Sequence, residues 1–130
     1  MNVLLVEPNA DPRAIEIDGS LAAMQSLVGG LIQAVYPFKD PVALICNDEG
    51  KLIGLSQNRP LKYPETGEIY DTVCGPFFLC SAPADSENFE SLPDDLIEKY
   101  SKVFALPSLV CTSCGNKFYR EQLSPFDGEL

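Results

Sequence analysis

Residues 31–55 read LIQAVYPFKDPVALICNDEGKLIGL, and this stretch decides the fold. Residues 31–36 and 42–46 are apolar runs of strand length, and a loop with two prolines separates them. The sequence NDEG at residues 47–50 is a strong turn signal, and we expect residues 51–55 to form a further strand after it. Consecutive strands with short connections are typical of an antiparallel sheet.

Two strands and a helix are expected before this stretch. Residues 2–7 (NVLLVE) are apolar enough for a strand buried on both faces, and residues 14–17 (AIEI) alternate like a second strand. Ser20 then predicts the N-cap of a short helix with one apolar stripe. Gly29 and Gly30 are expected to end that helix.

The sequence after residue 55 predicts a loop, a broken strand and a second helix. Residues 56–68 are polar and contain two prolines, which favours an ordered loop. Residues 69–73 and 77–80 predict strands on either side of a Gly-Pro break. Residues 92–104 carry an apolar stripe typical of an amphipathic helix, and Ser91 is expected to begin it with a capping box.

The order of these elements predicts an α+β fold. We expect a single small domain with a mostly antiparallel sheet and two helices on one face. The domain is expected to span residues 1–104, and residues 105–130 to form a C-terminal appendage, a short Cys-containing hairpin or tail.

Composition restricts the classes of function. The chain has 130 residues, of which nineteen are acidic and nine basic, so its net charge is −10. Such a charge repels a phosphate backbone, so we expect no direct nucleic-acid binding and favour a protein partner that is basic. The chain contains no histidine, the commonest general base and metal ligand. An enzyme dependent on carboxylates or cysteine therefore ranks last among the hypotheses.

The location of the protein is also predicted from what the sequence contains. No stretch approaches the ~18 consecutive apolar residues of a membrane span, and the N-terminus does not have the pattern of a secretory signal. We therefore expect a cytoplasmic protein with reduced cysteines and no membrane partner.

Residues 85–98 form an acidic run, which a solvated surface explains. The alternative is an anti-defence protein that mimics nucleic acid over a limited patch.

Cys111 and Cys114 carry the sharpest local signal, because CTSCG resembles one knuckle of a zinc ribbon. Structural zinc takes four ligands, and neither Cys nor His follows Cys114. Three alternatives stay open. Two chains share one zinc in a homodimer, Cys74 or Cys80 completes the site within one chain, or the turn holds no metal.

Asn58 and Arg59 form a second candidate site, for a ligand. They lie in the stretch expected to be a polar loop, where an arginine next to backbone amides suits an anion or a nucleotide. The alternative is an ordinary solvated arginine.

Several motifs together resemble a known family. They are VLLVEPNADP (residues 3–12), EIDGSLAAMQSLVGGLIQAVYPF (16–38), ALICNDEGKLIGLSQNRPL (43–61) and GEIYDTVCGPFFL (67–79). In this order they resemble domain-of-unknown-function family 3846, whose members are small proteins of phages, plasmids and conjugative elements in low-GC Gram-positive bacteria. The resemblance covers about three-quarters of the chain, and the cysteine-bearing tail lies outside it. It implies an accessory protein of a mobile element, and it supplies no catalytic residue.

One residue departs from the family pattern. A small residue usually precedes the glycine where this chain has Cys74 before Gly75, which favours Cys74 as a core substitution over a metal ligand. The favoured hypothesis is a non-enzymatic binding protein, which occupies a protein partner or sequesters a small ligand near Asn58 and Arg59. A zinc-stabilised homodimer built through the tail is the second hypothesis.

Overall fold

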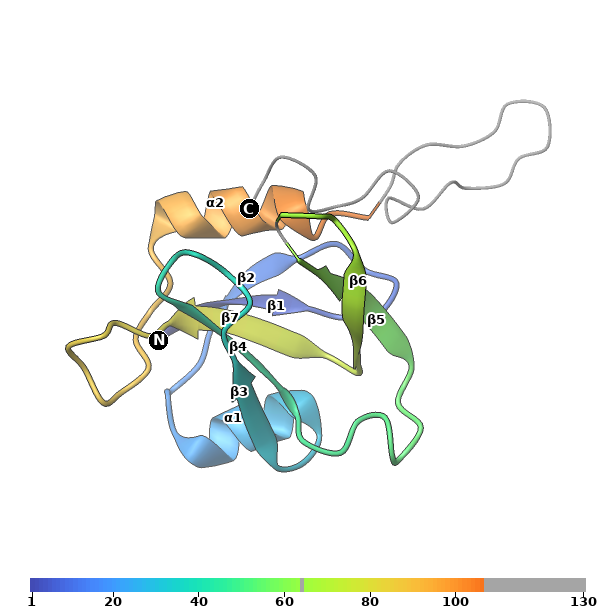
Figure 1. Ribbon diagram of the computed structural model, residues 1–130. Coiled ribbons are helices and arrows are strands. Elements are labelled where there is room, and N and C mark those ends of the chain that lie inside the picture. The colour runs from blue at the N-terminus through green and yellow to red at the C-terminus, as the bar shows by residue number, and fades with distance from the viewer. Residues whose placement is uncertain (64, 107–130) are drawn as a thin grey trace.

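The computed structural model describes residues 1–63 and 65–106, and it shows an α+β fold built on a five-stranded sheet (Figure 1). The strand order is β2-β1-β7-β4-β3, and each neighbouring pair is antiparallel. These strands are β1 (Asn2–Val6), β2 (Arg13–Glu16), β3 (Ile32–Val35), β4 (Val42–Asn47) and β7 (Phe77–Ser81). The predicted fold class and mostly antiparallel sheet are confirmed.

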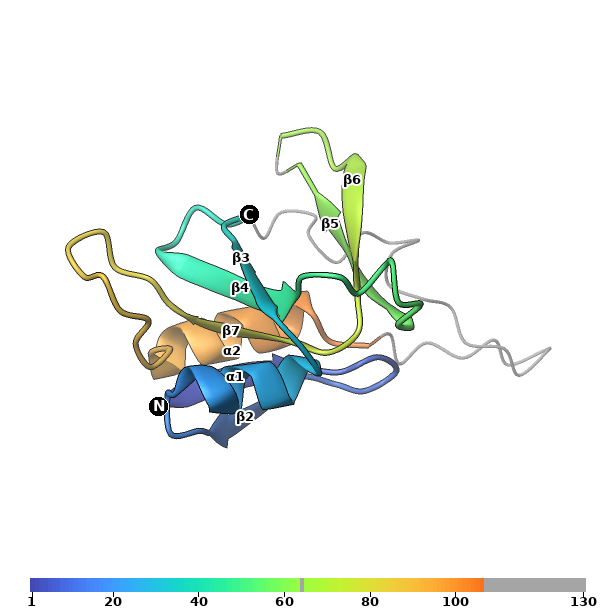
Figure 2. The same cartoon turned by 90° about the horizontal axis from the view of Figure 1, so that it is seen from below.

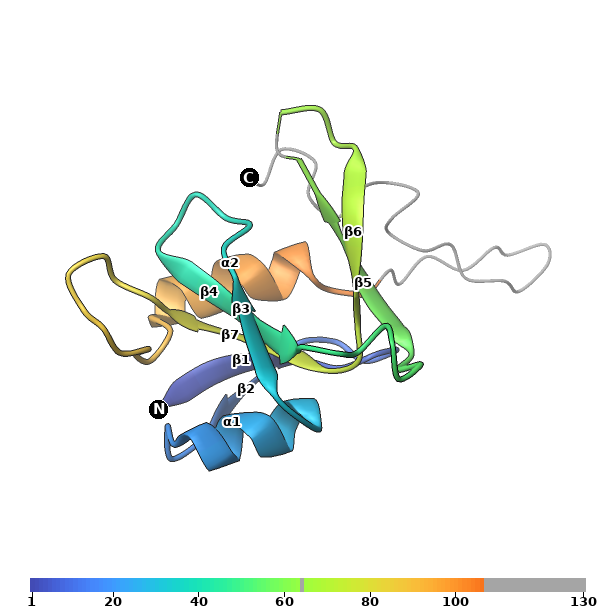
Figure 3. The ribbon, with the colours of Figure 1, turned by 60° about the horizontal axis from the view of Figure 1, so that its bottom comes forward.

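A second sheet is the antiparallel hairpin of β5 (Gln57–Lys62) and β6 (Ile69–Cys74), which rises away from the main sheet (Figures 2 and 3). The prediction of a loop over residues 56–68 is wrong for its first half, because β5 occupies residues 57–62. The pairing register shifts on both sides of Pro60, which allows a proline inside a two-stranded ribbon.

The predicted strand over residues 51–55 is also wrong, because the chain turns there. The N–H of Ile53 donates to the carbonyl of Glu49 at 3.0 Å, and that of Leu55 donates to the carbonyl of Gly50 at 2.9 Å. Gly54 has a φ of +76°, a backbone conformation that glycine adopts readily. The apolar residues of this stretch therefore lie in a connection and not in a strand.

The two helices are capped differently. Helix α1 (Leu21–Val28) begins as predicted, since Ser20 Oγ accepts the N–H of Ala23 at 3.1 Å, and Gly29 ends it with a φ of 78°. Helix α2 (Asp94–Val103) has Pro93 at its N-cap and no side-chain cap there, so the predicted capping box is wrong. Ser91 Oγ instead accepts the N–H of Asn2 at 2.9 Å and ties the start of β1 to the segment before α2.

The helices cover opposite faces of the main sheet, with α2 above it and α1 below it in Figure 1. Successive residues of a strand point to opposite faces, so β1 contributes Leu4 to the core under α2 and Val3 to the core over α1. The prediction that both helices lie on one face is wrong. The central strands are apolar at consecutive positions because each face is covered by its own helix.

The hairpin shares a core with α2. Leu61 of β5 and Val73 of β6 belong to the cluster that contains Tyr100 and Phe104. Phe77 and Phe104 pack in a T-shaped arrangement with 5.4 Å between ring centroids, which joins the sheet to the end of the helix. This packing fixes the hairpin on the α2 side of the molecule, where it faces the β3–β4 edge of the main sheet.

Candidate functional site

A cavity of about 300 Å³ lies between the β5–β6 hairpin and the neighbouring part of the main sheet. Its lining includes the apolar residues Val35 of β3, Leu61 of β5 and Val73 of β6, together with the charged residues Lys51 and Asp71. Pockets for small ligands are concave, mostly apolar and roughly 300–1,000 Å³ in volume, with a few polar groups that orient the ligand. The cavity has the size and lining of a small binding site.

The turn after β4 forms one side of this cavity, and two residues hold it in place. Asn47 is buried, and its side-chain amide bonds a backbone carbonyl at the end of α1 at 3.1 Å and a backbone N–H of the turn at 2.8 Å. Gly50 lies against β6, because a Cβ there would be 2.6 Å from the carbonyl oxygen of Cys74. The missing side chain lets the turn approach β6 closely and brings Lys51 to Asp71.

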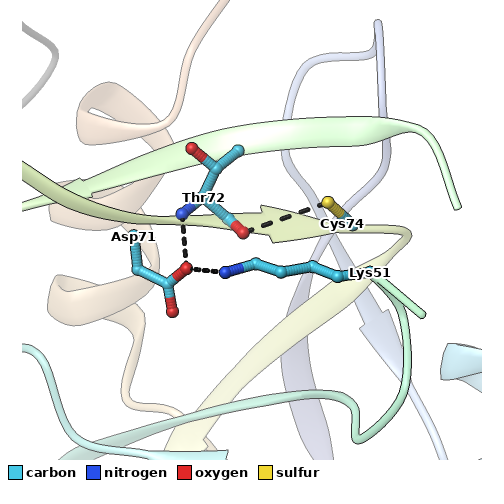
Figure 4. Close-up of polar contacts among 4 residues, drawn as sticks. All are labelled: Lys51, Asp71, Thr72 and Cys74. Atoms are coloured by element: carbon cyan, nitrogen blue, oxygen red, sulfur yellow. Dashed lines mark hydrogen bonds and ion pairs between the residues drawn. The ribbon is translucent and has the colours of Figure 1, made fainter. Parts of the chain in front are cut away.

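Lys51 and Asp71 form an ion pair at the cavity, between Lys51 Nζ and Asp71 Oδ1 (Figure 4). The same oxygen accepts the backbone N–H of Thr72 at 2.8 Å. Burial raises the pKa of Asp71, but the bonds from Lys51 and Thr72 outweigh it and leave that pKa below its usual value. The bond to Asp71 raises the pKa of Lys51. Both groups are therefore charged at neutral pH.

Two cysteines also line the cavity. Cys46 is 8% exposed, and its Sγ lies 3.8 Å from the carbonyl oxygen of Gln33. Burial raises the pKa of Cys46, and the negative charge of Asp71 raises it further, so this thiol keeps its proton. Cys74 is half-buried, with its Sγ 4.0 Å from the carbonyl oxygen of Thr72 (Figure 4). At Cys46 the cavity therefore presents a thiol and not a thiolate.

The cysteines considered as metal ligands differ in their surroundings. Cys80 is completely buried in β7, where burial raises the pKa of its thiol to about 12, as in a core residue. Cys74 is the more accessible of the two candidates for completing a site within one chain. Within residues 1–63 and 65–106, no group of three or more Cys, Asp or Glu is arranged to hold a metal ion. Cys111 and Cys114 lie outside the described residues.

The structure places Asn58 and Arg59 away from the lining of this cavity. The Asn58 amide donates to the carbonyls of Val6 and Gly75, at 2.9 Å each. Arg59 is 6% exposed and donates to the side-chain oxygen of Asn58 and to the backbone carbonyls of Asn58, Phe104 and Ala10. These bonds join β5 to other parts of the fold, and a ligand role for the two residues stays a prediction.

Sequence reasoning missed Lys51, Asp71 and Cys46 as site residues. They come from a turn, from β6 and from β4, and each is ordinary in its own stretch of sequence. One local signal was available, since Asp71 interrupts the otherwise apolar and aromatic start of IYDTVC. Their proximity depends on how the hairpin is placed against the turn, which no sequence pattern records.

Comparisons with known proteins identify a family. A family model described as a domain of unknown function (DUF3846) matches residues 1–105. That span includes every helix and strand described above and the whole cavity lining. No curated protein and no solved structure matches the chain. Neither helix in the described part has the length and apolar character to cross a bilayer.

Proposed function

The chain belongs to the DUF3846 family of domains of unknown function, and from that premise we propose that it is a non-enzymatic binding protein. The cavity beside Lys51 and Asp71 is its binding site, and the occupant is a small ligand or one side chain of a protein partner. The observation that carries the proposal is the cavity itself, whose lining holds both apolar side chains and a charged pair.

The titration behaviour of the cavity favours binding over catalysis. General acids and bases work best when their pKa lies near the operating pH. Here the pKa of Lys51 is raised, that of Asp71 is lowered and that of Cys46 is raised, each away from neutrality. The chain has no histidine to supply the missing group. These groups are suited to hold fixed charges and hydrogen bonds around an occupant.

We base the proposed cellular role on the sequence resemblance. Similar domains in phages, plasmids and conjugative elements support an accessory role in a mobile genetic element. We further propose that the protein acts in the cytoplasm. Its occupant there is a small molecule of the host cell, or a side chain of a protein that the host or the mobile element encodes. The net charge of −10 favours a basic partner through electrostatic steering.

A fragment screen read by amide NMR tests the proposal. We expect fragments to shift the amide signals of Val35, Cys46 and Asp71, which surround the cavity. A Val35→Trp variant places a bulky ring at the cavity from the edge strand β3 and should abolish these shifts. Leu31→Trp is the matched control, because Leu31 is 61% exposed just before the same strand and does not line the cavity.

Either of two results would contradict the proposal. One is a complete screen in which the cavity amides of the folded protein do not move. The other is a Val35→Trp protein that binds the same fragments as the wild type. Turnover of any substrate, lost on changing a cavity residue, would replace it with an enzymatic function.

A further inference from the structure

We infer that the cavity recognises a cationic group, an ammonium or guanidinium on an apolar stem, which displaces Lys51 from Asp71. This inference rests on the proposed binding function and names the chemical class of the occupant. A cationic group on an apolar stem has two sources. One is a free amine or guanidine, and the other is a lysine or arginine side chain of a protein partner.

The charges around the cavity favour a cation. Three carboxylates line it, those of Asp48, Glu49 and Asp71, against one ammonium, that of Lys51, so two negative charges are in excess. An anionic ligand would meet this excess at close range, whereas a cation would reduce it. The charge of the whole chain has the same sign and adds to the attraction.

The site already holds a cation, the ammonium of Lys51 on Asp71 Oδ1 (Figure 4). This contact shows that the carboxylate is placed to accept an N–H donor at the cavity. The side chain of Lys51 is 60% exposed and belongs to a turn, so it can swing into solvent. Solvent screening limits what such an exposed ion pair contributes to stability, so its exchange for an external cation costs little.

Asp71 keeps its position when Lys51 leaves. It lies within β6 opposite Leu61 of β5, so the hairpin ladder fixes its backbone. The N–H of Thr72 holds the acceptor oxygen at 2.8 Å, independently of Lys51. The incoming cation therefore meets a carboxylate that is already oriented, which reduces the cost of binding.

The apolar residues of the lining account for the stem of the ligand. Leu61 and Val73 are 3% and 7% exposed, and with Val35 they line the cavity on the hairpin and sheet sides. The methylene stems of lysine and arginine pack along apolar surface while their charged ends reach a polar partner. An alkyl chain with a terminal cation matches a cavity lining that holds both these apolar side chains and the Asp71 carboxylate.

The test compares ligands of similar length and different charge on the full chain at low salt. The probes are butylguanidine, pentylamine, pentanol and pentanoate, and the readout is the amide NMR shift with the dissociation constant. We expect both cations to shift the amide signals of Asp71 and Thr72, and to bind at least tenfold tighter than the alcohol or the carboxylate.

A second experiment separates the two sources of the cation, with an acetylated and amidated GGRGG peptide and its citrulline counterpart. Tighter binding of the arginine peptide than of butylguanidine identifies a partner's side chain as the source, and the reverse identifies a free small molecule.

Three variants separate recognition from a merely structural ion pair. Asp71→Asn should weaken cation binding at least tenfold, while Glu68→Gln, with the same charge change on the same hairpin, should not. Lys51→Met should tighten cation binding severalfold, because it removes the internal competitor. A structural ion pair would not produce that gain. The dispersion of the amide spectrum shows whether each variant is folded.

Two results would overturn the inference, and they differ from failure of the proposed function. Pentanol that binds as tightly as pentylamine, or unchanged cation binding by a folded Asp71→Asn protein, leaves a binding cavity without the proposed specificity. Cavity amides that respond to no fragment at all remove the proposed function together with the inference.

Discussion

Arg59 Nε, in β5, donates a hydrogen bond to the carbonyl oxygen of Phe104 at 3.0 Å, although 45 residues separate them in the chain. Phe104 is the C-cap of α2, so a positive charge lies at the end of a helix where carbonyls lack helical partners. The same guanidinium donates to the carbonyl of Ala10 in the β1–β2 turn at 2.7 Å. One buried side chain therefore joins the hairpin, the second helix and the first turn of the main sheet.

Replacing this guanidinium should destabilise the fold strongly. We expect Arg59→Ala to lower the free energy of unfolding by about 3 kcal/mol, because buried carbonyls lose charged donors. Urea unfolding followed by circular dichroism measures the change. Arg13→Ala is the control, since its side chain is 63% exposed in an ion pair with Glu7 and should cost no more than about 0.5 kcal/mol. Equal losses in the two variants would contradict the structural role of Arg59.

Asp40 should make stability depend on acid pH. Its Oδ2 accepts bonds from Lys99 Nζ at 2.8 Å and from the buried Tyr100 hydroxyl at 2.7 Å. The bond from Lys99, followed by that from Tyr100, lowers the pKa of Asp40 below its ordinary value of 3.8. A lowered folded-state pKa gives stability that is present above about pH 4 and is lost as pH falls through the folded-state pKa.

The dependence is measured by urea unfolding between pH 7 and pH 2. Asp40→Asn should flatten the acid limb of the curve, and Tyr100→Phe should cost about 1 kcal/mol at pH 7 through its lost hydrogen bond. Asp85→Asn, in an exposed loop, should retain the wild-type slope. An Asp40→Asn protein with the wild-type acid limb would show that other carboxylates dominate.

Local signals predicted the parts of the fold that depend on neighbouring residues. Ser20 and Gly29 cap α1 as expected, because a cap is settled within a few residues of chain. The strand β5 was missed because polar side chains and Pro60 count against a strand locally. Arg59 and Leu61 are stabilised there by contacts with residues distant in sequence. Tertiary packing outweighed local propensity in this stretch.

The side of the sheet occupied by each helix could not be read from the same signals. Of residues 2–7, predicted to be buried on both faces, residues 3–6 are buried, which is compatible only with cover on each side. The candidate site has the same limitation, since Lys51 and Asp71 meet through the placement of a hairpin that was not predicted. Arg59 is the opposite case. It stood out in a polar stretch of sequence as a ligand candidate, and the structure shows it bonded to other parts of the fold.

Thiol reactivity should follow burial. In a Cys111→Ser/Cys114→Ser background at pH 8, we expect iodoacetamide to modify Cys74 first and to leave Cys80 intact until the protein unfolds. Cys80 is completely buried, and burial raises the pKa of its thiol to about 12. The reagent therefore cannot reach this thiol, and the thiol keeps its proton at pH 8. Peptide mass spectrometry with and without urea measures the order. Modification of Cys80 as fast as Cys74 in the native state would contradict the core placement of β7.

Removing residues 107–130 should leave the domain folded. Every buried apolar residue of the described core lies at or before Phe104, and the family model ends at residue 105. A chain that ends at Leu106 should therefore unfold cooperatively, with a free energy within about 1 kcal/mol of the full chain, and should bind the same cavity fragments. Urea unfolding and the amide spectrum test this boundary between domain and appendage.

The same pair of proteins locates any bound zinc. Metal held by Cys111 and Cys114 should be found by elemental analysis in the full chain and be missing from the shortened one. Four thiolates from two chains give one zinc per two chains and a dimeric mass, whereas a site completed by Cys74 gives one per chain in a monomer. A shortened chain that fails to fold would contradict the domain boundary, because residues 107–130 would then belong to the cooperative unit.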